Sequence, residues 1–386
     1  MKKKVLWYAL AIFIVVVAVI GWRVYDEYRF WTRPWGKPDQ QIIVNIEEGM
    51  TARKIAGLLK QNGVIRDPKM FLAIADLRGF SNKIRAGEYE IRGASTPYEI
   101  VDMLATGYVY RRALVVPEGF TQAQIAERCG KLEICTKEDF LAETQQHNIF
   151  TFVIAQAPGG ANAACEGLLF PATYYFEKNT PAVKIVTRMT GTYENVWNDL
   201  YDEATKVPNK VWWWQDEKVS MLVNMNKVVV LASIIEKEAK RPEDRPKMAS
   251  VFVNRMKKGM ALQSDSTVRY AINDWSRPLT KSDLDFDSPY NTYKHTGLPP
   301  AAISNPGRAA LKAAMMPENT TYLFFITTDN GETVYSSTYD EHVRMKNQLK
   351  QERKLRAAEV EETVPEATAA TIKPATPVLQ PAMPPR

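Results

Sequence analysis

The chain has 386 residues and a formal net charge of +6; 45% of its residues are apolar and 24% are charged. These values are ordinary for a folded protein and leave room for one large core or two medium ones. The positive charge is spread along the chain, and no Lys/Arg block is interleaved with aromatic residues, which disfavours nucleic acid as a partner. The sequence has three histidines without metal-ligand spacing, no G-x-S-x-G elbow and no glycine-rich phosphate loop, which disfavours most zinc sites and His-based triads. We therefore expect no metal and no cofactor.

The N-terminus has the pattern of a membrane anchor. Three lysines, Lys2 to Lys4, precede an uncharged run from Val5 to Trp22. As a helix this run would be roughly 27 Å long, about the thickness of a bilayer's hydrocarbon core. The lysines predict that residue 1 stays in the cytoplasm and that the bulk of the chain lies outside it. The alternative is a cleaved signal peptide, but no A-x-A-like site closes the run, so residues 1–22 are predicted to be a single-pass anchor of the bacterial inner membrane.

An internal repeat follows a proline- and glycine-containing juxtamembrane linker at residues 23–40. Residues 44–56 recur in pattern at 114–126, and each copy predicts a short strand, a Glu-Gly turn, a threonine N-cap and two helices. This unit resembles LysM-type modules that bind glycan chains; the alternative is a small packing module without a ligand. We predict one LysM-like module at 41–110 and a second repeat at 111–145.

The rest of the chain reads as a mixed helix-and-strand domain followed by a polar tail. We predict an α+β fold with a catalytic domain at 111–350, which begins with the second repeat. Residues 351–386 are rich in Pro, Ala and Thr and are predicted to be disordered. Three cysteines are too few for a disulfide framework; Cys129 and Cys135 could bridge or stay free.

One predicted helix ends in a candidate catalytic acid. The apolar run from Val228 to Ile235 leads into Glu236, which shares its helix face with Ala232, Ser233 and Ala239. A carboxyl group among small residues at the end of a buried helix suits the floor of a cleft, where partial burial would raise its pKa as a general acid needs. The alternative is that Glu236 begins the solvated end of the helix and pairs with a nearby lysine. The pattern alone leaves both open.

Polar, stiff loops follow that helix. Residues 262–268, 288–293, 297–300 and 303–307 bring together amides, hydroxyls, tyrosines, prolines and glycines. A sugar-binding cleft uses such groups to bind hydroxyls and to cover the apolar faces of the rings. The same residues also dominate ordinary turns, which is the alternative interpretation.

Taken together, these segments resemble the YceG-like family of endolytic murein transglycosylases, over roughly residues 40–350. The matching motifs are Val-Pro-Glu-Gly ending at Gly119, Glu166 to Tyr174, Leu231 to Ala239, Ala249 to Arg255, Leu262 to Val268, Ser288 to Tyr293, Gly297 to Pro300 and Ser304 to Gly307. One departure is Ser266, where relatives often have proline; this predicts a looser loop.

The resemblance implies a reaction and an acid. The family's catalytic glutamate falls on Glu236, and the implied reaction cuts the MurNAc–GlcNAc β-1,4 bond inside nascent glycan strands, leaving 1,6-anhydro-MurNAc ends and so ending strand elongation. The substrate's own C6 hydroxyl replaces water, so one carboxylic acid suffices where a hydrolase generally needs two. The family also implies peptidoglycan synthases as partners, beside the glycan strands and the inner membrane.

The remaining site predictions concern substrate. We expect sugar to be positioned by Gln263, Asp265, Asn291, Tyr293 and Asn305, with Glu166 as a weaker candidate behind them, and we expect Glu238 to be structural. The first alternative is a non-catalytic glycan-binding scaffold of the cell-wall synthesis machinery. The second is a plain hydrolase with Asp265 as its second carboxylate. Product chemistry separates them, because a hydrolase leaves a reducing end and a transglycosylase leaves an anhydro ring.

Overall fold

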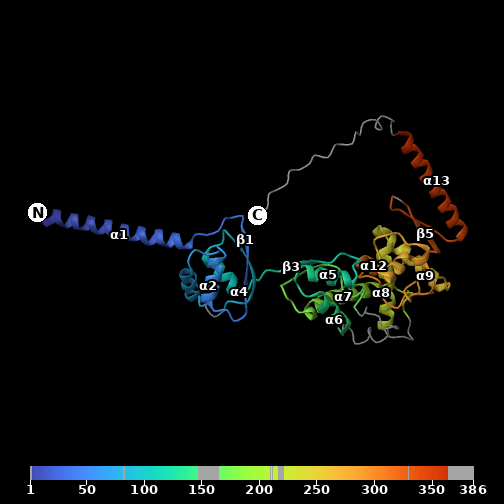
Figure 1. Ribbon diagram of the computed structural model, residues 1–386, viewed down its shortest axis with the longest axis horizontal. Coiled ribbons are helices and arrows are strands. Elements are labelled where there is room, and N and C mark those ends of the chain that lie inside the picture. Colours follow the sequence, from blue (N-terminus) through green and yellow to red (C-terminus); the bar gives the residue numbers. More distant parts are fainter. Residues whose placement is uncertain are drawn as a thin grey trace, which may run out of the picture.

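The computed structural model describes residues 2–80, 83–146, 165–208, 210, 212–215, 221–328 and 330–363. Over these residues the chain is mostly helical and contains three separate two-stranded antiparallel sheets (Figure 1). The predicted α+β class is confirmed at this level. Three hydrophobic clusters form the cores of the N-terminal module, of the second repeat and of the rest of the predicted catalytic domain, which we call the catalytic part after that prediction.

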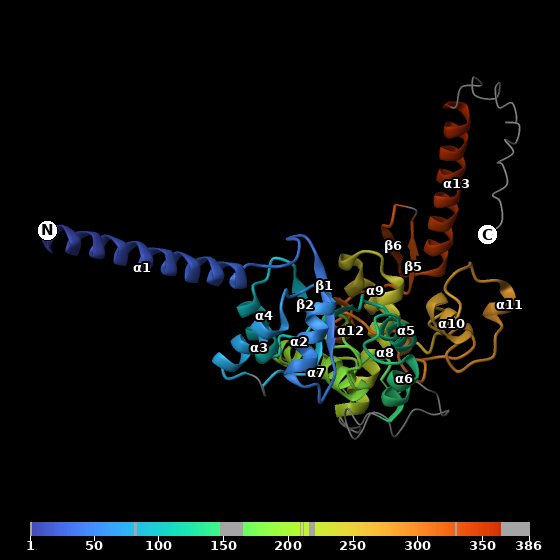
Figure 2. The same ribbon diagram turned by 60° about the vertical axis from the view of Figure 1, so that its left-hand side comes forward.

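The first helix, α1 (Lys2–Thr32), projects from the N-terminal module in both views (Figures 1 and 2). It continues through residues 23–32, which were expected to belong to the linker, because the first proline comes only at Pro34. Over the parts of the chain described in full, no helix has both the length and the apolar character needed to cross a membrane. The side chains of residues 5, 6 and 9, within the predicted anchor, lie outside the described set. The anchor therefore remains a prediction.

The N-terminal module contains the first copy of the repeat. Its elements are β1 (Gln41–Ile46), α2 (Ala52–Gln61), α3 (Pro68–Leu77), β2 (Gly87–Arg92) and α4 (Pro97–Thr106). Strand β1 pairs antiparallel with β2, so that Val44 lies opposite Tyr89 and both are buried. The predicted threonine cap is present, because Thr51 Oγ1 accepts from the Lys54 N–H at 3.3 Å.

The second copy repeats this strand–helix–helix order. Its elements are β3 (Arg112–Val115), α5 (Gln122–Lys131) and α6 (Lys137–Gln146), and β3 pairs antiparallel with the later strand β4 (Thr173–Phe176). Thr121 and Gln124 form a capping box at the start of α5. The sequence repeat therefore corresponds to a structural repeat. The three cysteines lie in or next to this copy as free thiols.

The catalytic part is built around one buried helix. Its elements are α7 (Ala182–Thr205), α8 (Met221–Glu238), η2 (Pro242–Asp244), α9 (Arg245–Lys257), α10 (Asp265–Ile272), α11 (Lys281–Leu284), α12 (Arg308–Met315), β5 (Phe324–Thr327), β6 (Thr333–Ser336) and α13 (Tyr339–Thr363). Helix α8 packs against α9, α10 and α12. Its residues 228–235 are all buried, which explains why the run is apolar on every face.

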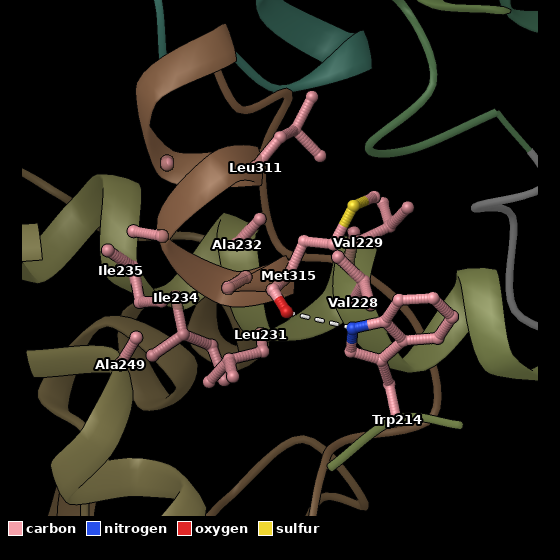
Figure 3. Close-up of a cluster of buried hydrophobic side chains, with 14 of the residues drawn as sticks. Trp214, Val228, Val229, Leu231, Ala232, Ile234, Ile235, Ala249, Leu311 and Met315 are labelled. Carbon is pink, nitrogen blue, oxygen red and sulfur yellow. Dashed lines mark hydrogen bonds between the residues drawn. The ribbon is translucent and has the colours of Figure 1, made fainter. Parts of the chain in front are cut away.

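Large side chains lock α8 against its neighbours. Trp214 is buried against the α8 and α12 side chains, and its indole N–H donates to the Met315 carbonyl at 2.8 Å (Figure 3). Because protein interiors are close-packed, the side chains around α8 hold the helix in a fixed position. Helix α8 is therefore a rigid support for whatever its C-terminal turn presents.

The last helix departs from the predicted domain limits. Helix α13 runs to Thr363, so residues 351–363, which were assigned to a disordered tail, are helical (Figure 2). The stretch is rich in Lys, Glu, Arg, Leu and Ala, which favour helix without a buried partner. Residues 364–386, the remainder of the predicted tail, lie outside the described residues.

Candidate active site

Glu236 occupies the C-terminal turn of α8 and is nearly closed off from solvent, with a side chain 5% exposed. Its Oε1 accepts a hydrogen bond from Arg245 Nη2 at 2.8 Å, and its Oε2 accepts from the Gly307 backbone N–H at 3.0 Å. Of the two settings considered from sequence, the structure thus shows the buried one. Its ion-pair partner is Arg245, at the start of α9.

Gly307 lies next to the carboxyl groups of both Glu236 and Glu118. It is the N-cap residue of α12, so its N–H belongs to the group of free donors at a helix start that favour a carboxylate. A Cβ at this position would overlap the carboxyl group of Glu118. Glycine therefore lets two acidic side chains approach the same helix N-terminus.

The environment of Glu236 raises the pKa of its carboxyl group. Burial raises the pKa of Glu236 above its ordinary value, and the negative charge of Glu118 raises it further. The Gly307 N–H and the Arg245 guanidinium oppose this by stabilising the carboxylate. The result is a carboxyl group that holds its proton more readily than an exposed glutamate, beside donors that accept the anion once the proton leaves.

A second carboxylate stands at this site. Glu118 lies in the Pro-Glu-Gly turn of the second repeat, with Oε2 3.5 Å from Arg245 Nη2 and a side chain 49% exposed. Gly119 follows with φ +78°, and its N–H donates to the Asn305 carbonyl at 2.8 Å. Sequence reasoning quoted this turn as a family motif but did not select Glu118. No signal in the sequence separates Glu118 from Glu48, which precedes the equivalent glycine of the first copy.

Glu166 and Asn305, both predicted site residues, form a buried cluster. Glu166 Oε1 accepts from the Gln122 N–H at 3.0 Å and from Asn305 Nδ2 at 2.8 Å. Asn305 Oδ1 accepts from the Leu169 N–H at 2.8 Å. Burial raises the pKa of Glu166 to about 8. Both side chains are thus engaged in joining three loops.

The predicted sugar-binding loops divide into exposed and buried members. Gln263 and Asp265 are exposed, and Asp265 Oδ1 accepts from the partly buried Tyr293 hydroxyl at 2.6 Å. Asn291 is fully buried; its Nδ2 donates to two backbone carbonyls and its Oδ1 accepts from the Tyr293 N–H at 3.0 Å. Gln263, Asp265 and Tyr293 can therefore meet a ligand, while Asn291 shapes the loop that holds Tyr293.

Glu238 joins this loop region to α8. Its Oε1 accepts from Ser264 Oγ at 2.5 Å and from the Ser266 N–H at 3.3 Å. The structural role expected for Glu238 matches these bonds. A proline at position 266 would have no N–H to donate, so Ser266 adds a link to the loop here rather than removing one.

Comparisons with known proteins agree with the motifs. A family model described as the YceG-like family matches residues 44–348. The endolytic murein transglycosylase of Bacillus subtilis (strain 168) is 33% identical over 317 residues, which cover 79% of this chain and 84% of that protein. The endolytic murein transglycosylase of Streptococcus pneumoniae (strain ATCC BAA-255 / R6) is 27% identical over 330 residues, which cover 78% of this chain but only 57% of that protein. The crystal structure of a yceG-like protein from Listeria monocytogenes has 34% sequence identity and a TM-score of 0.52, with coverage of 79% of this chain and 99% of that one.

Proposed function

The chain belongs to the YceG-like family, as its motifs predicted, and on this premise we propose that it is an endolytic lytic transglycosylase of peptidoglycan. The proposed reaction cuts the MurNAc–GlcNAc β-1,4 bond within nascent glycan strands. It leaves 1,6-anhydro-MurNAc ends and so ends strand elongation. The observation that supports it most is the buried Glu236 carboxyl group, set between Arg245 and the N-terminus of α12.

In the proposed mechanism Glu236 acts first as an acid and then as a base. Its proton moves to the glycosidic oxygen as the C1–O bond breaks, and the substrate's N-acetyl group stabilises the positive charge at C1. The C6 hydroxyl of the same sugar then bonds to C1 while its proton returns to Glu236. No water is consumed. The raised pKa of Glu236 favours the first step, and Arg245 and the Gly307 N–H stabilise the carboxylate between the steps.

A plain hydrolase is the alternative against which the other carboxylates near Glu236 are weighed. A hydrolase generally needs carboxyl groups on both sides of the scissile bond. Glu118 shares Arg245 with Glu236, so both carboxylates lie on one guanidinium. Asp265, the partner considered for a hydrolase, already accepts a hydrogen bond from the Tyr293 hydroxyl.

For substrate binding, the proposal gives direct sugar contacts to Gln263, Asp265 and Tyr293. Their exposure and their attachment to α8 through Glu238 support this assignment. The buried Asn291 and Asn305 then act as positioning residues that fix the loops.

We also propose that residues 5–22 of α1 anchor the protein in the inner membrane, with the N-terminus cytoplasmic and the remainder periplasmic. The lysines before the run and the exposed apolar side chains along α1, such as Ile12, Val15 and Ile20, support this. The two repeats are proposed to be LysM-like, and peptidoglycan synthases are proposed partners.

The proposal is tested with the full chain in detergent and uncrosslinked glycan strands, with products read by mass spectrometry. Wild type is compared with Glu236→Gln, which keeps the shape of the side chain and loses its proton. We expect wild type alone to release products about 18 Da lighter than those of hydrolysis, the difference of one water. Glu194→Gln, at an exposed position of α7 away from these contacts, is the matched control and should leave the products unchanged.

Three other outcomes would each change the conclusion. Reducing-end products would mean a hydrolase and redirect attention to Asp265. Equal cleavage by wild type and Glu236→Gln would remove Glu236 as the acid. Binding of strands without cleavage would favour the non-catalytic scaffold.

A further inference from the structure

Two adjoining cavities lie where the chain passes from the N-terminal module into the second repeat. One has a volume of about 910 Å³ and lies among β2, α4, the segment 107–111 and Tyr175. The other has a volume of about 600 Å³ and lies along β4 and the start of α7. Arg111 and Tyr175 line both, so the two cavities adjoin, and we name them together the junction groove. Glu236 lines neither cavity.

The larger part of the junction groove presents tyrosine rings to solvent. Tyr108 is 78% exposed and Tyr175 is 63% exposed, and the half-buried Tyr110 is part of the same lining. Exposed aromatic rings gathered in one hollow mark binding surfaces more often than a chance distribution on a surface does. A tyrosine gives a flat apolar face and a hydroxyl, which suits the apolar face and the hydroxyls of a sugar ring.

The smaller part of the junction groove is basic. Its lining holds four cationic side chains and one acidic one, Glu177, which lies 4.0 Å from the first of them. The cationic side chains are Arg111, Lys178, Lys184 and Arg188. Arg111 is paired with Glu177 and Lys178 with Glu133 at 3.2 Å, so Lys184 and Arg188 carry most of the charge that attracts a ligand with carboxylates. The uncrosslinked stem peptides of peptidoglycan have free carboxylates and are attached to the sugars at short intervals.

Buried ion pairs hold the two sides of the junction groove together. Arg112 Nη1 lies 2.5 Å from Glu88 Oε2, and these side chains are only 13% and 11% exposed. Lys178 Nζ lies 3.8 Å from Glu88 Oε1, and the Tyr110 N–H donates to the Glu88 carbonyl at 2.6 Å. The groove is therefore formed before any ligand arrives, which lowers the entropy lost on binding.

We propose that the junction groove is a second substrate-binding site, which holds a stretch of glycan on its tyrosines and the adjacent acidic stem peptide on its cationic end. This inference rests on the proposed function, because that function names the strand. The site retains long strands on the protein while Glu236 cuts elsewhere along them. It therefore acts on the KM for long strands and leaves kcat unchanged.

The test uses full-length protein in detergent and two variants of the groove. Tyr108→Ala/Tyr175→Ala removes the exposed rings, and Arg111→Ala/Arg188→Ala removes part of the positive charge. Tyr339→Ala, an exposed tyrosine on α13, is the matched control. Substrates are uncrosslinked strands with stems, the same strands with stems removed by an amidase, and short oligosaccharides with one cleavable bond. Binding of labelled strands is measured in parallel by fluorescence anisotropy.

The tyrosine variant should raise KM and Kd about fivefold or more on both kinds of long strand. The arginine variant should do so only on strands that keep their stems. Neither should change kcat or the cleavage of short oligosaccharides. Unchanged KM and Kd in both variants, with wild type active, would overturn the second site and leave the enzymatic function intact.

A result with binding but no cleavage can also be interpreted. Strand binding that falls in the groove variants, in a protein that cleaves nothing, would support the second site and overturn the proposed reaction. If wild type neither binds nor cleaves long strands, both proposals are wrong. A loss of binding equal to that of Tyr339→Ala would point to a general surface effect and also overturn the site.

Discussion

Glu118 and Glu236 share one guanidinium, and this predicts a coupling between them. The charge of Glu118 raises the pKa of Glu236, so Glu118→Gln should lower it. In the proposed mechanism Glu236 is active when protonated, so activity is lost as pH rises through its pKa. The alkaline limb of the kcat profile should therefore move to lower pH, and activity at neutral pH should fall about two- to tenfold. The measurement is a pH–rate profile on glycan strands.

The internal repeat supplies the control for this prediction. Glu48 occupies the same place in the first copy as Glu118 does in the second, and Gly49 has φ +80° where Gly119 has +78°. Glu48→Gln should therefore repeat the local change in the turn without touching Glu236. Matching profiles for the two variants would show that Glu118 does not tune the acid.

The predicted site residues show how far reasoning from single residues of the sequence could reach. The helix pattern alone left open whether Glu236 was buried or began the solvated end of its helix; the structure buries its side chain, and its catalytic role remains our proposal. Asn291 and Asn305 were chosen for their amides, yet their amides bind backbone and a buried carboxyl group. Residue type tells that an amide forms hydrogen bonds, but whether it faces a ligand or a neighbouring loop depends on contacts far apart in the sequence.

Glu166 ties separate elements together and predicts a pH dependence of stability. Burial raises its pKa from the ordinary value to about 8, so the folded state holds a proton that the unfolded chain releases near pH 4.5. Because the folded state binds more protons over this window, the free energy of unfolding should fall as pH rises from about 5 to 8, by at most about 1.4 kcal/mol per pH unit. Glu166→Gln should remove this slope. Urea unfolding at several pH values measures it.

A matched variant on a neighbouring element checks that the slope belongs to Glu166. Glu194 lies on the exposed face of α7, so Glu194→Gln should keep the wild-type slope. A slope that persists in Glu166→Gln would place the responsible proton on another group.

At the scale of elements, local sequence chemistry predicted where helices begin better than where they end. Thr51 and Thr121 each cap a helix, as the sequence indicated. The end of α1 and the start of the tail were placed too early, because prolines that lie further along the chain were taken to characterise the whole linker and the whole tail. Charged residues such as Lys, Glu and Arg are good helix formers, and helices continue through them until a proline or glycine intervenes.

At the scale of the whole molecule, the arrangement of the module against the second repeat depends on pairs that no local pattern reveals. Glu88 and Arg112 belong to strands of different sheets, and each looks like an ordinary surface charge in the sequence. Their burial at the junction makes them the contact that sets the relative position of two separate cores. The sequence could predict two repeats, but not the ion pair that joins them.

This arrangement predicts how the junction fails. Arg112→Gln should leave the largely buried Glu88 without its nearest partner, at a cost of about 3 kcal/mol that the module can avoid by moving away and hydrating that carboxylate. The segment 107–111 should then be cut by protease at least about tenfold faster, because local opening controls cleavage there.

The control is Arg277→Gln, which breaks a more exposed pair with Asp283 inside the catalytic part. Adding Glu88→Gln to Arg112→Gln removes the unpaired charge and should restore much of the protection, whereas equal cleavage in the single and double variants would show that the ion pair does not hold the junction.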